Sequence, residues 1–337
     1  MSRNAGSTIA PERVRSATAL RIWPQYLLVV AATCATLLAM YFGLLVGLDR
    51  TGNLPPPAIV NSSCSDEKIQ WMRDHAPDQP NLLVVGSSVA WRNVDSAEFT
   101  RRDPAVEPLN GASCGLKANQ TEFLTNYLLG RFPSVQTVVA VIVPEDFSGC
   151  DKVHARFFDP DAVDEYAFQR QWKYGFYFRY FDMISLVRNA FTIGAMRSGR
   201  NEFDSLVMTR FGDAPLYTHK DRGAFYGPFA GYDASCFAAL HRLAETVTSS
   251  GRRFVVATSP LDPDWFRQYD PDGAVRDRLV AGVRSAVEGT GTQVWDGSRA
   301  FAADRSAFTD AIHLKSSGAQ QYSALLADAL DAKQARD

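Results

Sequence analysis

The sequence predicts an α/β fold in which helices cover both faces of a central parallel sheet, after one N-terminal transmembrane helix. Short apolar runs rich in β-branched residues, typical of strands buried on both faces, alternate with amphipathic helical patterns. The runs lie near 81–86, 136–144, 252–260 and 292–297. Because strands and helices alternate along the chain, parallel pairing with helical crossovers is the natural packing. An uncharged apolar segment before the first run predicts the transmembrane helix.

The helices between these runs are indicated by the spacing of their apolar residues and by their ends. The patterns occupy 121–132, 236–251 and 276–291, and each ends in glycine or in Phe-Pro, where a helix stops. A further helix is predicted at 65–76, ahead of the first strand, and another at the C-terminus, after His313. The sheet is therefore expected to have helices on each side.

Composition limits the kinds of partner that the chain is expected to bind. The 337 residues are 46% hydrophobic, which is ample for a large core. The 35 basic residues are nearly balanced by 37 acidic residues, for a net charge of -2. A nucleic-acid-binding domain is usually basic or carries a basic stripe, so no nucleic-acid partner is expected.

The apolar segment 26–48 is long enough to cross a hydrocarbon core of ~30 Å at ~1.5 Å per residue. No small-residue cleavage motif follows it, which favours an uncleaved signal anchor. The arginines that precede it are Arg3, Arg13, Arg15 and Arg21. This bias predicts a cytoplasmic 1–25 segment, a single pass through the inner (cytoplasmic) membrane, and a periplasmic or other extracytoplasmic main domain.

The cysteines fit an exported domain. Cys34 lies within the predicted span, whereas the other four lie beyond it, where disulfides persist. Those four are Cys64, Cys114, Cys150 and Cys236. Their spacing is too wide for a C-x-x-C metal site, so two disulfides are expected. Four cysteines permit three pairings, and all three stay open at this stage.

The exported part divides into a linker and a main domain. Segment 49–80 is predicted to be a proline-rich linker followed by the first helix, and 81–332 to be the α/β domain. An aromatic-rich stretch at about 155–231 contains no clear strand of the main sheet, so it is interpreted as an insertion. Its aromatic residues either form a subsidiary core or provide a surface for sugar rings or a membrane partner.

The Gly-Ser-Ser sequence at the end of the first strand is the main candidate for chemistry. Ligands of α/β sheets bind at the carboxyl ends of the strands, where Ser88 is placed. A serine nucleophile needs a base held by an orienting group. His313 lies after the last strand, and Asp310 stands three residues before it, so the pair can supply both functions. In the alternative interpretation, Ser88 is an ordinary turn residue, Asp310 is a turn or cap residue, and His313 is a polar group with its hydrogen bonds satisfied.

These residues occur in segments that resemble the SGNH (GDSL-like) hydrolase and acyltransferase superfamily. The segments "VVGSS", "LNGASCG" and "FTDAIHLKSSGAQQY" resemble its first, second and fifth sequence blocks. The resemblance implies a flavodoxin-like three-layer sandwich, with Ser88 as nucleophile and Asp310 and His313 as the other triad members. It also implies an oxyanion hole formed by the N–H groups of Ser88 and Gly111, with Gly115 and Asn110 in reserve. No metal or other cofactor is implied.

The chain departs from the family in its third block. An asparagine normally completes the oxyanion hole there, whereas "VIVPEDFSG" contains Glu145 and Asp146. Asn110 or Asn119 is the expected substitute. The Gly-Ser-Ser form is more similar to membrane-anchored family members that acylate cell-envelope polymers. That resemblance implies a polysaccharide acceptor and an integral membrane partner that supplies the acyl group.

The expected activity is therefore transfer of an acyl group, most simply acetyl, to a hydroxyl of an exported or cell-envelope polysaccharide. A carbohydrate esterase of the same fold is one alternative. A catalytically weak carbohydrate-binding or scaffolding subunit of an export complex is another. The candidate substrate-binding residues are Trp91, Glu145, Asp146, Trp172 and Tyr174.

Overall fold

The computed structural model describes residues 17–334 and divides the chain into two compact units. The first unit, Met1–Leu54, contains helix α1 (Ala17–Arg50), and the second begins at Pro55. Much of the segment predicted to be cytoplasmic, including Arg3, Arg13 and Arg15, lies outside the described residues.

Helix α1 contains the predicted transmembrane segment. Its part Trp23–Arg50 has a mean hydropathy of 2.2 and is, by length and composition, able to cross a membrane. It is the one helix of this kind among residues 17–334. Only 11% of its most apolar stretch of 18 residues is buried, so it is not the buried core helix of a domain. The predicted span 26–48 lies inside it.

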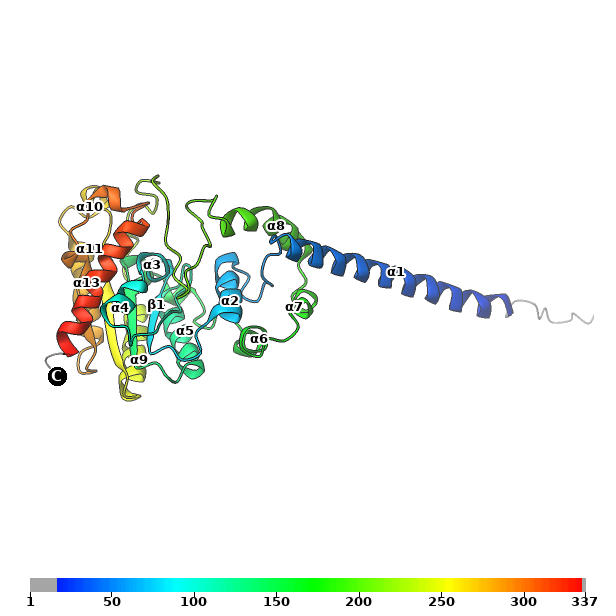
Figure 1. The fold of residues 1–337 in the computed structure, drawn as a ribbon, viewed down its shortest axis with the longest axis horizontal. Coiled ribbons are helices and arrows are strands. Elements are labelled where there is room, and N and C mark those ends of the chain that lie inside the picture. Colours follow the sequence, from blue (N-terminus) through cyan, green and yellow to red (C-terminus); the bar gives the residue numbers. More distant parts are fainter. Residues whose placement is uncertain (1–16, 335–337) are drawn as a thin grey trace, which may run out of the picture. The chain divides into compact units, whose positions relative to one another are not determined.

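The second unit contains the sheet and the remaining helices (Figure 1). In chain order these are α2 (Ser63–His75), β1 (Leu82–Gly86), α3 (Ser88–Asn93), α4 (Ala97–Arg102), β2 (Pro108–Asn110), α5 (Ala118–Arg131), β3 (Thr137–Ile142), α6 (Pro160–Val163), α7 (Lys173–Arg179), α8 (Met183–Arg197), α9 (Ala234–Ser249), β4 (Arg253–Thr258), α10 (Pro263–Tyr269), α11 (Ala274–Ala286), β5 (Gln293–Trp295), α12 (Gly297–Ala300) and α13 (Ser316–Gln334). Short 3-10 turns lie at Pro144–Phe147, Cys150–Lys152 and Arg305–Ala307, with a π turn at Asp164–Phe168.

The sheet has five strands in the order β2-β1-β3-β4-β5, and every neighbouring pair is parallel. This is the flavodoxin-like order, and it confirms the predicted α/β class. Strand β2 was not predicted, because its three residues are too few to form a periodic pattern. The order places β1 beside β3, and so places the segments that follow these two strands next to each other.

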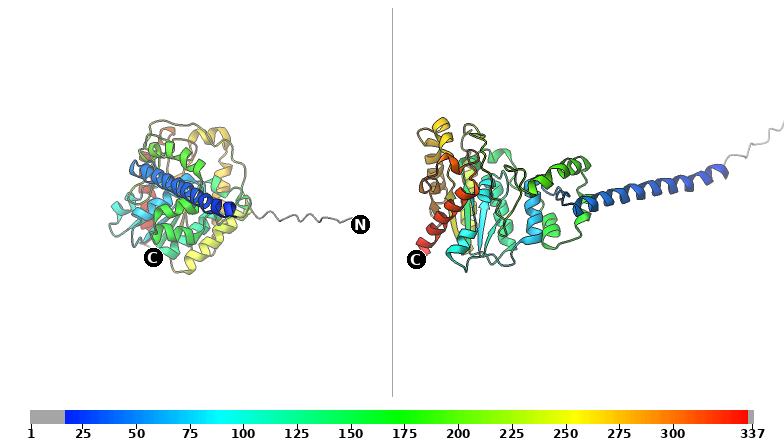
Figure 2. Two further views of the ribbon diagram at one scale, coloured as in Figure 1. Left: turned by 90° about the vertical axis from the view of Figure 1, so that its right-hand side faces the viewer. Right: turned by 45° about the horizontal axis from the view of Figure 1, so that its top comes forward.

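Each face of the sheet has its own hydrophobic core, which gives the domain three layers (Figure 2). Leu83 and Val85 of β1 belong to one core, together with residues of α5, α9 and α11. Leu82 and Val84 belong to the other core, with residues of α3 and α13. Successive side chains of a strand point to opposite faces, so a strand between two cores is apolar throughout. This explains the continuous apolar runs in the sequence.

The transition from β1 to α3 requires glycine at position 86. Gly86 has φ of +140°, and a Cβ there would lie 2.4 Å from the Val141 carbonyl oxygen and 2.8 Å from Ala90 Cβ. Ser87 then caps α3, because its side chain accepts a hydrogen bond from the Val89 N–H. The chain therefore leaves the sheet and begins a helix within two residues, which places Ser88 in the first turn of α3.

Two disulfides are present, as predicted, and the structure selects one of the three pairings. Cys64 pairs with Cys114, which joins the start of α2 to the loop after β2. Cys150 pairs with Cys236, which joins the segment after β3 to α9. Helix α2 is therefore bound covalently to the sheet domain.

The aromatic-rich insertion contributes no strand to the five-stranded sheet, as predicted. Its first part extends a core. Phe158 packs edge-on against Phe123 and Tyr127 of α5, and Tyr166 packs against Phe176 of α7. These contacts support the interpretation of this part as a subsidiary core.

A buried polar cluster centred on Asp213 joins the insertion to the sheet. The carboxylate accepts hydrogen bonds from Ser96 Oγ at 2.7 Å and from Asn110 Nδ2 at 2.8 Å. The Lys68 ammonium lies nearby, and it donates to the Gly212 carbonyl at 2.6 Å. Both side chains are buried, and burial lowers the pKa of Lys68 to about 7 and raises the pKa of Asp213, while the interaction between the two groups opposes both shifts.

Asp213→Ala is expected to lower the free energy of unfolding by roughly 1–3 kcal/mol for each buried donor that loses its acceptor, among them the Ser96 hydroxyl and the Asn110 amide. Denaturant unfolding of this variant beside exposed Asp272→Ala measures the effect. Equal stability of the two variants would show that the cluster does not contribute to stability.

Candidate active site

The structure brings together the three residues that the sequence nominated for catalysis. Ser88 Oγ lies 2.9 Å from His313 Nε2, and His313 Nδ1 lies 2.9 Å from Asp310 Oδ2. The imidazole therefore holds its proton on Nδ1, facing the carboxylate, and offers Nε2 to the serine hydroxyl. This arrangement can activate the hydroxyl for attack on an ester or other acyl carbonyl.

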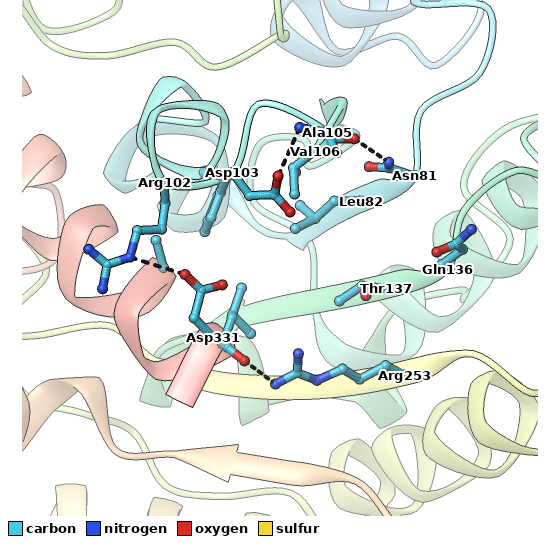
Figure 3. Close-up of a pocket in the computed structure, with 13 residues that line it drawn as sticks. Asn81, Leu82, Arg102, Asp103, Ala105, Val106, Gln136, Thr137, Arg253 and Asp331 are labelled. Carbon is cyan, nitrogen blue, oxygen red and sulfur yellow. Dashed lines mark hydrogen bonds and ion pairs between the residues drawn. The ribbon is translucent and has the colours of Figure 1, made fainter. Parts of the chain in front are cut away.

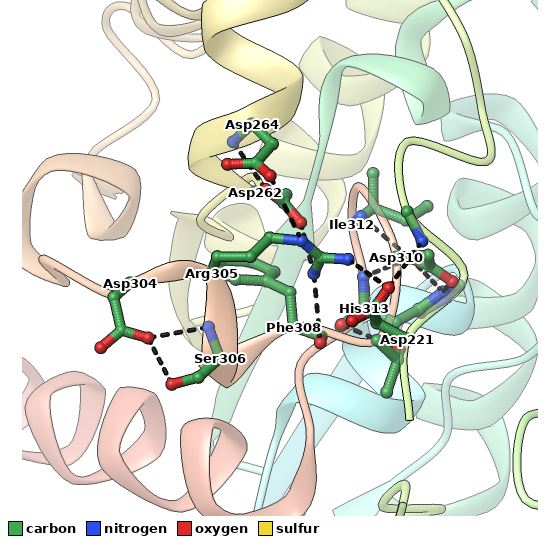
Figure 4. A network of polar contacts seen from close by, with 12 residues as sticks. Asp221, Asp262, Asp264, Asp304, Arg305, Ser306, Phe308, Asp310, Ile312 and His313 are labelled. Carbon is green, nitrogen blue, oxygen red and sulfur yellow. Dashed lines mark hydrogen bonds and ion pairs between the residues drawn. The ribbon is translucent and has the colours of Figure 1, made fainter. Parts of the chain in front are cut away.

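Asp310 is buried and ionised within a tight turn (Figure 4). Its Oδ1 accepts the backbone N–H groups of Ile312 at 3.0 Å and His313 at 2.8 Å. Burial alone raises the pKa of Asp310, but the charge of His313 and these hydrogen bonds outweigh it and hold the pKa below its ordinary value. The carboxylate therefore stays charged and can stabilise the imidazolium that forms during reaction.

Asn93, at the end of α3, holds the backbone on both sides of His313. Its Nδ2 donates to the Ile312 carbonyl at 2.8 Å, and its Oδ1 accepts the Leu314 N–H at 2.8 Å. The side chain is completely buried, with a second donor bond to Ser259 Oγ. The sequence analysis missed this residue, because nothing in the local pattern around Asn93 marks a partner more than 200 positions away.

The last part of the insertion crosses the catalytic turn, and residues 216–227 are called the strap from here on. The Arg222 N–H donates to the Thr309 carbonyl at 2.5 Å, and Leu216 bridges to Lys315. In Figure 4 the strap's Asp221 lies beside Arg305, with which it forms an ion pair at 2.9 Å. The Tyr226 ring centroid lies 5.9 Å from that of His313. Tyr226 was also missed, although an aromatic pair between glycines at 223 and 227 is an available signal.

Gly111 does not fit its predicted function in the oxyanion hole. Its N–H donates to the Val84 carbonyl at 2.8 Å, as part of the contact between β2 and β1. A Cβ there would lie 2.4 Å from Leu128 Cδ1, so this glycine is required for packing. Gly115, the reserve, has φ of +67° and is exposed, and no described residue accepts its N–H. The adjacent Cys114 fixes this loop through its disulfide.

The two asparagines proposed as substitutes have their amides committed elsewhere. Asn110 is completely buried and donates to the Ala90 carbonyl and to Asp213. Asn119 donates to the Cys150 and Val153 carbonyls. Neither amide N–H group is available to an oxyanion, so both predictions are corrected. Both side chains stabilise loops instead.

Glu145 and Asp146 occupy different environments at the end of β3. Asp146 is buried, accepts the Val143 N–H at 3.0 Å, and is hydrogen-bonded by Ser87. It supports the backbone beside Ser88 and is too buried to bind an acceptor. Glu145 is half-buried, and its Oε2 is shielded without a hydrogen-bond partner among the described residues. Burial raises the pKa of Glu145.

The aromatic candidates lie away from the triad. Trp91 belongs to α3, and its side chain is completely buried. Its indole donates to the Gly212 carbonyl at 2.8 Å, so it cannot contact a substrate. Trp172 and Tyr174 belong to the α7 region, which Figure 1 shows on the other side of α2 from α3. The aromatic residues that do lie beside His313 are Tyr226 and its neighbour Phe225, which pack edge-on.

A separate pocket of about 190 Å³ lies where β1, β3 and β4 begin (Figure 3). This is the opposite edge of the sheet from Ser88. Its polar groups largely bind one another, since Arg102 pairs with Asp331 and Asn81 donates to the Ala105 carbonyl. We assign no chemistry to it. Within residues 17–334 there is no group of three or more His, Cys, Asp or Glu side chains placed to hold a metal ion.

The solved structures that are similar to this chain include two esterases. One is Est24, a carbohydrate acetylesterase from Sinorhizobium meliloti, with 10% identity and a TM-score of 0.41 over 75% of this chain and 99% of that chain. The other is an aryl esterase from M. smegmatis in an inhibitor-bound form, with 10% identity and a TM-score of 0.37 over the same shares. No family model and no curated protein matches the chain.

Asp146 is expected to make the fold less stable at alkaline than at acidic pH. Burial raises its pKa from 3.8 to about 7, so protonation favours the folded state. The contribution of Asp146 to the free energy of unfolding is complete below about pH 4 and is lost as the pH rises through 7. Asp146→Asn keeps the shape and an acceptor for the Val143 N–H.

The melting temperature of this variant is therefore expected to fall less between pH 5 and pH 8 than that of the wild type. Some decline remains, because burial also raises the pKa of Asp66 to about 7. Exposed Asp272→Asn, as the control, should follow the wild type. Parallel curves for wild type and Asp146→Asn would contradict the expectation.

Proposed function

We propose that this chain is a membrane-anchored serine acyltransferase that transfers an acyl group, most simply acetyl, to a hydroxyl of an exported or cell-envelope polysaccharide. The observation that carries the proposal is the continuous hydrogen-bonded series from Ser88 through His313 to Asp310. A serine, an imidazole and a buried ionised carboxylate in this order are what acyl transfer through a covalent intermediate requires.

In the first step Ser88 Oγ attacks the acyl carbonyl, and His313 Nε2 takes the hydroxyl proton. The N–H of Ser88 at the start of α3 and the N–H of Gly115 are the proposed donors to the oxyanion. Collapse of the tetrahedral intermediate returns the proton from His313 to the leaving group. In the second step His313 removes a proton from the acceptor hydroxyl, which attacks the acyl-Ser88 ester. When the second tetrahedral intermediate collapses, the bond from the acyl carbon to Ser88 Oγ breaks and His313 returns the proton to Ser88 Oγ.

The strap supports a carbohydrate acceptor. Phe225 is 64% exposed, and Tyr226 lies beside His313, so the two rings offer an aromatic surface at the entrance to the triad. Arg222 lies over the Phe225 ring, 5.6 Å from its centroid, and adds a hydrogen-bond donor at the same place. Flat aromatic faces with nearby polar groups suit the apolar faces and hydroxyls of sugar rings.

The anchor supports the proposed location and partner. The arginines before the candidate span favour a cytoplasmic N-terminus, and the two disulfides suit an oxidising compartment outside the cytoplasm. The proposed location is therefore the outer face of the inner membrane. Acyl-coenzyme A is confined to the cytoplasm, so an integral membrane protein is the proposed acyl donor.

The second candidate is a carbohydrate esterase, in which water replaces the sugar hydroxyl in the second step. The same triad and the same acyl-Ser88 serve both reactions, which differ in how well water is excluded. A carbohydrate-binding or scaffolding subunit is disfavoured by the assembled triad, because scaffolding has no use for an activated serine.

The two adjacent serines provide a matched test of the nucleophile. Exposure of the full chain to an activated acetyl ester is expected to leave an acetyl adduct on Ser88, read by mass spectrometry of peptides. Ser88→Ala should lose the adduct and lower ester turnover at least roughly a thousandfold. Ser87→Ala should retain the adduct, because its hydroxyl faces Asp146. An adduct that persists in Ser88→Ala would rule out this nucleophile.

Transfer and hydrolysis are distinguished by how the acyl-enzyme is discharged. Neutral, uronic-acid and amino-sugar oligosaccharides are offered in turn, and acetylated sugar is measured beside free acetate. Transfer predicts faster discharge with at least one oligosaccharide, and a several-fold loss of that gain in Phe225→Ala with water discharge unchanged. Trp172→Ala, an exposed aromatic residue of the α7 region, is the matched control. Discharge by water alone would favour the esterase.

A further inference from the structure

Helix α8 has two apolar faces, of which the protein covers only one. Leu186 and Ile193 point inward and are almost completely buried. On the outer face, Ile184 and Phe191 are each 83% exposed, and Val187 between them is 41% exposed. Positions 184, 187 and 191 form one stripe along a helix, because they are three or four residues apart. The exposed side chains therefore form a continuous strip rather than scattered positions.

Two more apolar side chains near the starts of α7 and α8 are also exposed. Phe181, just before α8, is 60% exposed, and Trp172, just before α7, is 61% exposed. An exposed apolar strip such as that of positions 184, 187 and 191 marks a site of interaction with a protein or a membrane. We call the outer face of α8, formed by Ile184, Val187, Arg188 and Phe191, the outer strip.

The connectivity of the chain indicates whether the outer strip contacts a membrane or another protein. The candidate span ends at Arg50, and the second unit begins at Pro55. Five residues of extended chain reach at most about 17 Å. The hydroxyl of Tyr177 in α7 donates to the Pro55 carbonyl at 2.6 Å, so α7 lies at the point where the chain enters the domain. Only three residues separate α7 from α8.

The composition of the strip suits lipid head groups. Phe191 and Ile184 provide apolar groups of the size that enter the boundary between head groups and acyl chains. Arg188 lies on the same face and is exposed, so its guanidinium can reach lipid phosphates while its stem stays beside the apolar residues. Aromatic, aliphatic and basic residues on one helix face are characteristic of interfacial helices.

We propose that the outer strip of α8 lies in the head-group region of the membrane that α1 crosses, and holds the domain in a defined orientation against the lipid. The proposed partner of the outer strip is lipid rather than another protein, because the short connection from Arg50 to Pro55 limits how far α7 and α8 can lie from the bilayer. This inference goes beyond the proposed acyl transfer and does not depend on the chemistry at Ser88.

The test measures the depth of nitroxide labels on the full chain in nanodiscs of phosphatidylethanolamine and phosphatidylglycerol. Native Cys34 is free and is labelled first, to report whether the span is immersed. In a Cys34→Ser background, Ile184→Cys and Phe191→Cys report on the strip, and Ala274→Cys on exposed α11 is the control. The readout is collision with oxygen, which concentrates in lipid, relative to collision with a water-soluble nickel chelate.

The expected result is an oxygen-to-nickel ratio several-fold higher at positions 184 and 191 than at 274, and highest at Cys34. A high ratio at Cys34 with water-like ratios at 184 and 191 would overturn the docking proposal and leave the anchor intact. Protection of 184 and 191 from both reagents would overturn it in favour of a protein contact. A water-like ratio at Cys34 would overturn the anchor and the docking proposal together.

Discussion

The hydrogen bonds of Asn93 are the constraint on which the reaction centre depends. Helix α3 begins at Ser88 and ends at Asn93, so one rigid element carries both the nucleophile and the clamp on the histidine. The buried amide binds the residues on either side of His313, which come from the far end of the chain. A shift of α3 would therefore move Ser88 and the imidazole together. Gly86 sets the start of the helix, because no side chain fits at this position against the Val141 carbonyl of β3 and Ala90 of α3.

The carboxyl groups around the triad have pKa values that their different environments shift in opposite directions. Asp310 receives backbone N–H groups and the imidazole, and these hold its pKa low. Asp146 is hydrogen-bonded by Ser87, the neighbour of the nucleophile, and Glu145 precedes it in the chain; burial raises the pKa values of both and so weakens their preference for the charged form. A neutral acid does not oppose negative charge that develops on a nearby carbonyl oxygen. Environments that separate pKa values in this way allow several carboxyl groups to occupy one site.

The insertion has three parts along the chain, and each has a different place in the structure. Its first aromatic residues, around Phe158, extend the core beside α5. Helices α7 and α8 follow and expose apolar side chains near the point where the chain enters the domain. The strap then returns across the catalytic turn and brings Tyr226 beside His313. One excursion from the sheet thus links the part of the domain that the chain enters first to the part that contains the triad.

The sequence by itself determined the α/β class, the candidate span, the number of disulfides, and the nomination of Ser88, Asp310 and His313. The first three follow from composition, from periodicity or from spacing within a short segment, and local patterns report such features well. The choice of the three catalytic candidates rested in addition on the resemblance of their segments to a known superfamily. Only the tertiary structure decided the cysteine pairing, strand β2, the commitment of the Gly111 N–H to Val84, and the positions of Asn93 and Tyr226. These depend on contacts between distant segments, such as the one from Asn93 to Ile312 across 219 positions. The sequence contains many possible acceptors for a given hydrogen-bond donor. Only the packing of the folded chain selects the acceptor that lies within reach of it.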